Sequence, residues 1–185
     1  MNRRAVVKKL LSKRNNLLVV AGLGSTAWDC TAAGDSPLTF PMWGAMGQAA
    51  MMGLGLALAQ PKRRVLVITG DGEALMGLGA LATIGVQKPA NLTVVVIDNE
   101  RFGETGMQET HTAHGVDLAG VARACGFRIF AFENLETAVH KEAGPNFAAV
   151  KVKAEKIPLV LPPREGALLK ARFRRELLGP EADAE

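Results

Sequence analysis

Cysteines, aromatic residues and long apolar runs are scarce in this chain of 185 residues, and each scarcity excludes a class of protein. Its two cysteines provide neither a disulfide framework, a zinc ligand set nor an iron–sulfur motif. Aromatic residues make up 5% and form no recognisable nucleic-acid-binding module. The most apolar stretch, residues 45–60, is too short to span a bilayer comfortably, so we expect a helix that is buried on all sides. We therefore expect a globular protein with neither a nucleic acid nor a membrane partner.

Positive charge is concentrated at the two ends of the chain, in "NRRAVVKKLLSKR" and "KARFRR". We interpret both runs as solvated helix faces, and the net charge of +4 suits small anionic substrates. The basic start followed by "LLVVAGLGSTA" is similar to a signal peptide, but its apolar core is short and its charge is spread out. Because Val6, Leu10 and Leu11 recur at helical spacing, we expect a helix, then a strand, in a cytoplasmic protein.

Apolar strands alternate with helical patterns through most of the chain, which predicts a doubly wound α/β domain. The strand at 91–100 is a near-continuous Val/Ile run, typical of a parallel sheet covered by helices on both faces. We place this single domain at residues 1–157, and an arm, a basic helix and a frayed acidic tail at 158–185. The expected strands are 17–23, 64–70, 91–100, 127–132 and 146–154, the helices 45–60, 73–86, 116–126 and 134–144, and a loop covers 34–44.

A dinucleotide-binding fingerprint is suggested by Gly22, Gly24 and Ala27 after the first strand. Two features argue against it. The sequence after Thr26 is not typical of a helix, and no Asp or Glu occurs between Ser36 and Gly70 to bind a ribose. We therefore reject NAD binding, although Ser25 and Thr26 remain hydroxyl donors at the end of a strand.

The stretch Gly70-Asp71-Gly72 stands where a strand stops and a helix begins. Glycines there let the main chain approach a ligand, and free N–H groups at a helix start suit phosphate oxygens. A carboxylate among phosphates repels them unless a cation lies between, and Mg²⁺ prefers such oxygen ligands. Asp71 therefore predicts a divalent metal ion.

A second oxygen ligand is expected from Asn99, 28 positions later, at the end of the next strand. Adjacent strand ends lie about 5 Å apart, so the Asn99 amide oxygen can lie beside Asp71. The main-chain carbonyl of Arg101 could provide a third ligand. A helix cap at Asp71 and a plain turn at Asn99 are the alternative.

This GDG motif with an Asn one crossover later resembles the diphosphate-binding domain of thiamine-diphosphate-dependent enzymes. The resemblance covers about residues 17–152 and implies thiamine diphosphate and Mg²⁺ as cofactors, the metal held by Asp71, Asn99 and Arg101. The segment "RFGETGMQETHTAHGVDLAGVARACGF" resembles sulfopyruvate and phosphonopyruvate decarboxylases in particular. The likeness also implies that Met46 supports the bent cofactor. The cofactor-binding residues implied are Gly24, Ser25, Thr26, Gly44, Ala45, Met46, Gly70, Asp71, Gly72, Glu73, Ala74, Asn99, Arg101, Phe102 and Gly103.

The resemblance also implies a partner. In this family a glutamate from a separate pyrimidine-binding domain contacts the cofactor, and this chain has no room for that domain. We expect a hetero-oligomer, with two-fold symmetry, in which a second subunit supplies it and the helix at 45–60 contributes to the contact. The implied reaction is decarboxylation of a small anionic 2-oxo acid.

Glu104, His111 and His114 follow Asn99 on a loop expected to overhang the reactive carbon, and are our candidates for proton transfer. A solvated loop or a subunit contact would explain them equally, and a zinc site from Glu109, His111 and His114 lacks a regular scaffold. Carboligation of the acetolactate synthase type and a non-catalytic cofactor-binding subunit are alternative functions. Ferredoxin-linked oxidation and a split transketolase fit less well, because the cysteines and the length are insufficient.

Overall fold

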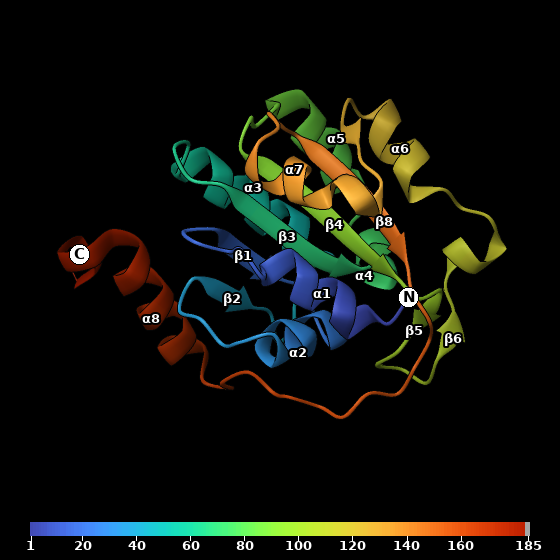
Figure 1. Ribbon diagram of the computed structural model, residues 1–185, viewed down its shortest axis with the longest axis horizontal. Helices are drawn as coiled ribbons and strands as arrows, with labels where there is room; N and C mark the ends of the chain where they lie inside the picture. Colours follow the sequence, from blue (N-terminus) through green and yellow to red (C-terminus); the bar gives the residue numbers. More distant parts are fainter. Residues whose placement is uncertain (184–185) are drawn as a thin grey trace.

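The computed structural model describes residues 1–183, and residues 184–185, the end of the expected acidic tail, lie outside them. A six-stranded sheet of order β2-β1-β3-β4-β8-β7, parallel throughout, forms the centre of the fold (Figure 1). Its strands are β1 (Leu18–Ala21), β2 (Thr39–Pro41), β3 (Val65–Gly70), β4 (Leu92–Asp98), β7 (Arg128–Ile129) and β8 (Asn146–Lys151). A small antiparallel ribbon pairs β5 (Arg101–Phe102) with β6 (Gln108–Glu109).

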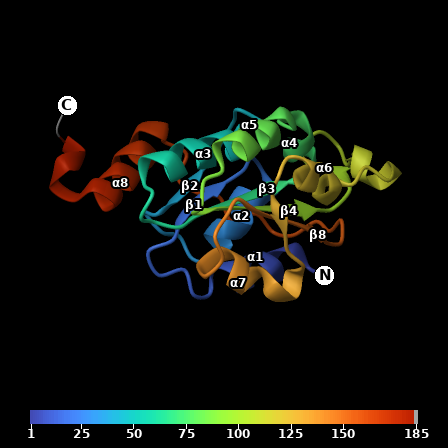
Figure 2. The same cartoon turned by 90° about the horizontal axis from the view of Figure 1, so that it is seen from above.

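Helices cover both faces of this sheet, so the predicted doubly wound fold is confirmed (Figure 2). One layer contains α3 (Ala49–Ala59), α4 (Asp71–Met76), α5 (Gly79–Gln87) and α6 (Leu118–Ala124). The opposite layer contains α1 (Arg3–Leu11), α2 (Ser25–Ala32) and α7 (Leu135–His140). Short 3₁₀ turns, η1 (His111–His114) and η2 (Phe132–Asn134), precede α6 and α7.

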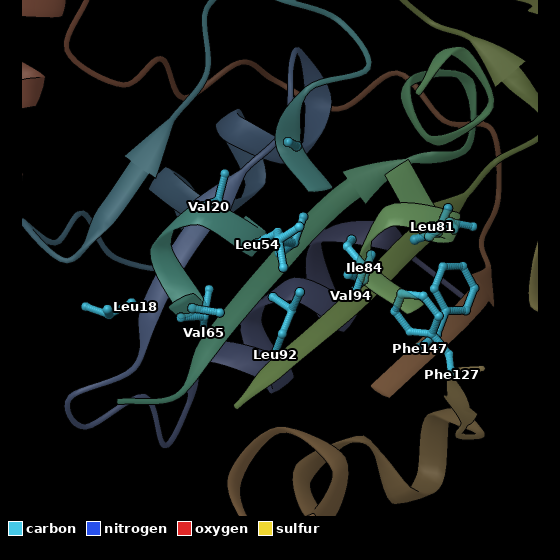
Figure 3. Close-up of a cluster of buried hydrophobic side chains, with 14 of the residues drawn as sticks. Leu18, Val20, Leu54, Val65, Leu81, Ile84, Leu92, Val94, Phe127 and Phe147 are labelled. Carbon is cyan, nitrogen blue, oxygen red and sulfur yellow. The ribbon is translucent and has the colours of Figure 1, made fainter. Parts of the chain in front are cut away.

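Strand geometry sorts the apolar side chains into two cores, because successive residues of a strand point to opposite faces. In β3, Val65 and Val67 belong to the cluster under α3 and α5, whereas Leu66 and Ile68 pack under α1 and α7. Figure 3 shows the first cluster, which Phe127 and Phe147 close with an edge-to-face contact. The Val/Ile runs of β3 and β4 are thus buried on both sides.

The helix α2 was not predicted, and the argument that no helix follows Thr26 is wrong. Its residues are modest helix formers, but tertiary contacts override such weak preferences. Ala27 and Cys30 are buried in the second core, and Asp29 is 1% exposed. The guanidinium groups of Arg3 and Arg4 lie 3.0 and 2.9 Å from the Asp29 carboxylate. Arg3 is itself buried, so this part of the basic N-terminal run is not a solvated face.

Three smaller expectations also differ from the structure. The edge strand β2 lies inside the expected 34–44 loop, where Pro41 is tolerated because it ends an edge strand. The helix expected over 73–86 divides at Gly77, which presses so closely on Gly47 that a side chain at Gly77 would collide with the Gly47 carbonyl. The helix α3 is not buried all round, since Leu58 is 51% exposed.

After β8 an extended segment, residues 152–165, crosses the molecule to helix α8 (Gly166–Leu178) and the turn η3 (Gly179–Asp183). Figure 1 shows α8 lying beside β2. Leu169 and Phe173 are buried there, and Phe173 meets Phe40 edge to face, with ring centroids 5.7 Å apart. Within residues 1–183, no helix combines the length and apolarity that crossing a membrane requires.

Candidate functional site

The carboxyl ends of β3 and β4 bring Asp71 and Asn99 together. Gly70 pairs with Ile97 across these strands, so the residues that follow them meet at one edge of the sheet. The backbone N–H of Asn99 donates to Asp71 Oδ1 at 3.3 Å. The Asn99 side-chain oxygen accepts from the N–H of Arg101 at 3.0 Å, which shapes the turn into β5. The GDG motif and the distant Asn thus form one site.

Two buried carboxylates share this edge through a pair of threonine hydroxyls. Asp71 and Asp98 are 1% and 2% exposed. The Thr110 hydroxyl donates to Asp71 Oδ2 at 2.5 Å, and the Thr112 hydroxyl donates to Asp98 Oδ1 at 2.8 Å. The two hydroxyl oxygens lie 2.9 Å apart, so the two threonines lie side by side between the carboxylates.

Only one of the two carboxylates, that of Asp98, has a cationic side chain beside it among residues 1–183. Lys151 Nζ lies 2.9 Å from Asp98 Oδ2, whereas Asp71 has no ion-pair partner among residues 1–183. Burial raises the pKa of Asp71, the Thr110 hydroxyl opposes that rise, and the nearby Asp98 adds to it. A buried carboxylate beside other oxygen groups, with no cation of its own, has the donor chemistry of a Mg²⁺ site.

A hollow of about 80 Å³ opens beside Asp71 and contains most of the predicted site residues. Gly70 and Gly103 face open space, which leaves the main chain accessible. Over Gly72 the ring of Phe102 is so close that an added Cβ would lie 2.6 Å from it. The residues that line this hollow are Leu23, Ser25, Met46, Gly70, Asp71, Gly72, Glu73, Ile97, Asn99, Arg101, Phe102, Gly103, Glu104 and Thr105.

Other predicted residues lie outside this hollow or turn their side chains away from it. The Thr26 hydroxyl is buried and donates to the Gly22 carbonyl at 2.7 Å. The carboxylate of Glu73 accepts from the N–H of Leu23 and the hydroxyl of Thr69. Ala74 borders a different, much smaller void. Two more, Gly44 and Ala45, are exposed just before α3, and Gly24 begins α2 with a φ of 74°.

The three proton-transfer candidates are separated by the β5–β6 ribbon. Glu104 lines the hollow and lies over Gly24, where an added Cβ would be 2.7 Å from Glu104 Oε1. Burial raises the pKa of Glu104, and Arg3 opposes that rise. His111 faces a second hollow, and His114 Nε2 lies 3.2 Å from Glu109 Oε2. In residues 1–183, no three His, Cys, Asp or Glu side chains converge to hold a metal.

That second hollow is apolar, measures about 600 Å³ and adjoins the first along Met46, Gly72, Phe102 and Thr105. Large apolar side chains border it on the solvent side. Met76 is 67% exposed there and Val116 39%. An open apolar surface of this kind is typical of a protein interface or a ligand-binding groove. The remaining lining residues are Leu75, Leu78 and His111.

Sequence reasoning missed the supporting residues Asp98, Thr110, Thr112 and Lys151. Asp98 stands directly before Asn99 at a strand end, so its position was a usable signal. The two threonines are brought to Asp71 by the β5–β6 ribbon and η1, and Lys151 by the end of β8. Only tertiary structure places them.

Comparisons with known proteins identify relatives of this chain. The family model described as "Thiamine pyrophosphate enzyme, C-terminal TPP binding domain" matches residues 24–160. The sulfopyruvate decarboxylase subunit beta of Methanothermobacter thermautotrophicus is 37% identical, over 99% of both chains. The phosphonopyruvate decarboxylase of Streptomyces viridochromogenes is 43% identical over 68% of this chain and 32% of its own length.

A solved structure gives the same architecture. The benzoylformate decarboxylase of Polynucleobacter necessarius superposes with a TM-score of 0.65 at 20% identity. The match covers 85% of this chain and 33% of that one, so this chain spans about a third of the larger enzyme. At that identity the likeness supports the fold alone. The family model and the end-to-end similarity to a sulfopyruvate decarboxylase subunit beta show that the chain belongs to the thiamine pyrophosphate enzymes and contains their C-terminal TPP binding domain.

Proposed function

We propose that this chain is the diphosphate-binding subunit of a 2-oxo acid decarboxylase that depends on thiamine diphosphate and Mg²⁺. The observation that carries the proposal is the buried Asp71, which has no ion-pair partner among residues 1–183 and lies beside Asn99 at the neighbouring ends of β3 and β4. The end-to-end similarity to a sulfopyruvate decarboxylase subunit beta supports a substrate of that class, a small 2-oxo acid with an anionic tail.

Asp71, the Asn99 side chain and the Arg101 carbonyl would hold the metal. All three are oxygen ligands, and the carboxylate supplies the charge. The diphosphate would then lie along Ser25, Gly70, Gly72 and Gly103, where glycines expose the main chain. Gly24, Thr26, Glu73, Ala74 and Phe102 would contribute through the main chain or by shaping the cradle.

Met46 borders both hollows, so it would support the part of the cofactor that passes from one to the other. Gly44 and Ala45, just before it, would offer main-chain groups to the aminopyrimidine. The backbone of Ala45 is left-handed, with a φ of 54°, and this turn sets the direction of the segment.

The bound cofactor supplies the carbon nucleophile and the electron sink for loss of carbon dioxide. The protein's residues position that group and exclude water. Glu104 lines the hollow with a raised pKa, which favours a carboxyl able to hold a proton there. His111, beside the apolar hollow, and His114, on the outer side of the same loop, are the other candidates for this role.

A partner subunit would cover the apolar hollow and supply the pyrimidine-binding domain with its glutamate, in an assembly with two-fold symmetry. The exposed Met76 and Val116 support this position, and Leu58 gives the helix at 45–60 an exposed apolar residue as well. The relatives named "subunit beta" support a hetero-oligomer.

The test is reconstitution. The chain should be co-expressed with a candidate partner that carries a pyrimidine-binding domain and assayed with a panel of 2-oxo acids, with and without Mg²⁺. We expect metal-dependent decarboxylation by the pair and none by the chain alone. Robust turnover by the isolated chain would contradict the two-subunit proposal, and a ligated product in place of an aldehyde would favour carboligation.

A further inference from the structure

Glu73 follows the GDG motif directly, where a side chain facing the diphosphate would place one negative charge against another. The structure avoids this repulsion by turning the carboxylate inward. The residue is 5% exposed, and its Oε2 accepts from the N–H of Leu23 at 3.0 Å and the hydroxyl of Thr69 at 2.7 Å. Gly22 makes room for it, because a side chain at Gly22 would collide with Oε2.

The same residue also lies beside the start of α3, because Glu73, Gly47 and Ala49 line one small void of about 10 Å³. Burial raises the pKa of Glu73, and Thr69, the N–H of Leu23 and then those of Ala49 and Gly47 oppose that rise. Among residues 1–183, Oε1 has no hydrogen-bond partner, although it is buried. Oε2 is therefore the oxygen that accepts from the N–H of Leu23 and the hydroxyl of Thr69.

These donors come from three segments that the proposed cofactor site brings together. Leu23 precedes Gly24 and Ser25 at the diphosphate end. Gly47 and Ala49 follow Met46, under the proposed passage to the aminopyrimidine end. Thr69 precedes Gly70 and the metal-binding Asp71. Gly47 is also held against Gly77, at the end of the same helix that contains Glu73.

We propose that Glu73 is a positioning residue that sets the separation between the diphosphate end and the aminopyrimidine end of the cofactor site. Its side chain does so without touching the cofactor, by accepting hydrogen bonds from Leu23 and Thr69 and by lying beside Gly47 and Ala49 at the start of α3. This inference rests on the proposed function, since it assumes that both segments contact thiamine diphosphate.

The substitution Glu73→Gln tests the positioning role. A glutamine has a similar shape, but its NH₂ group cannot accept a hydrogen bond, so it must face one set of donors without bonding to them. Two probes of different length report the result in the assembled complex: thiamine diphosphate with Mg²⁺ reaches both ends, whereas inorganic pyrophosphate with Mg²⁺ reaches only one. We expect the dissociation constant to rise about tenfold for the cofactor and less than about threefold for pyrophosphate, since a lost charged hydrogen bond has roughly that effect.

Thr93→Val is the matched control, because Thr93 is a buried hydroxyl at the other end of the sheet that donates to the Ala138 carbonyl. It should lower the melting temperature without changing either dissociation constant. Equal weakening of both probes by Glu73→Gln, or no weakening of either, would overturn the positioning role. Failure of the wild-type complex to bind either probe would instead overturn the proposed function.

Where Glu73→Gln destabilises the complex, hydrogen exchange of the free chain gives a second measurement. The amides of Leu23 and of Gly47 or Ala49 should exchange faster than in wild type, while those of β4 remain protected. Faster exchange throughout the sheet, with no selective effect at these segments, would show a merely structural role.

Discussion

The two ends of the sheet differ in the sign and the burial of their charged side chains. At the carboxyl ends of the strands, Asp71 and Glu73 are buried, and burial raises the pKa of each. At the amino ends of β1 and β3, an open hollow of about 490 Å³ is bordered by four cationic residues. Nearby, Arg172 and Arg14 hold the pKa of Asp35 below its usual range. The cations around this hollow are Arg14, Lys62, Arg63 and Arg64.

The difference lies in how the charges are satisfied. Guanidinium groups at the amino end donate to neutral acceptors, such as Arg63 to the Asn16 carbonyl at 2.9 Å, in a space open to water. At the carboxyl end, hydroxyl and N–H donors surround carboxylates that water barely reaches. A buried charge without an opposite charge is costly, so a protein retains one where a ligand compensates it. The comparison therefore supports the proposed site at the carboxyl end.

The largest effect should come from Asp71→Asn. We expect the affinity for thiamine diphosphate with Mg²⁺ to fall by at least about 100-fold. Loss of a residue that supports a metal ligand typically weakens binding about 10- to 100-fold, and loss of the ligand itself should weaken it more. The melting temperature should stay equal or rise, since a buried negative charge is removed. Calorimetry and thermal melts of the complex measure both. Lys62→Ala, on the exposed amino end, is the control, and an Asp71→Asn variant with affinity within threefold of wild type would contradict the assignment.

The next effect should come from the hydroxyl that supports Asp71. Thr110→Val removes the donor at 2.5 Å, so we expect a loss of about 1–3 kcal/mol in the free energy of unfolding and an approximately tenfold weaker cofactor affinity. Thr39→Val is the matched control at the amino end, where the Thr39 hydroxyl accepts from Arg14 at 2.9 Å. It should lower stability alone. A change in cofactor affinity with Thr39→Val would break the comparison.

Much of this contrast could be predicted from the sequence, and its limits have physical reasons. Asp71 and Asn99 follow long Val/Ile runs, so their meeting at one edge was predictable from strand periodicity and crossover length. Thr110 and Thr112 reach Asp71 and Asp98 through a ribbon without periodicity, which conceals their role. The helix α2 was missed because Asp29 and Cys30 gain their stability from α1 and the second core, and not from local preference.

A smaller effect is expected on the pH dependence of folding stability, to which the two ends of the sheet should contribute in opposite directions. Because its folded pKa is raised above the ordinary value of 3.8, Asp71 adds stability at low pH that is lost as the pH rises through the folded pKa. The pKa of Asp35 is lowered, so its contribution to stability is fully present above the ordinary value of 3.8 and is lost as the pH falls through the folded pKa. Denaturant titrations of the free chain between pH 3 and pH 7 should therefore show that Asp71→Asn and Asp35→Asn change the profile in opposite directions. Parallel profiles would contradict the contrast.

The smallest effect should come from Asp35→Asn at pH 7. Both Asp35 oxygens accept from the Arg172 guanidinium, at 2.7 and 2.9 Å, and this pair fixes α8 to the segment before β2. The Asp35 side chain is 45% exposed, so we expect a loss of at most about 1 kcal/mol in the free energy of unfolding. The change should appear as faster hydrogen exchange in α8, with cofactor affinity unchanged. Because Phe173 still packs on Phe40, α8 should remain docked, and its complete release would show that the ion pair, and not the apolar contact, holds it.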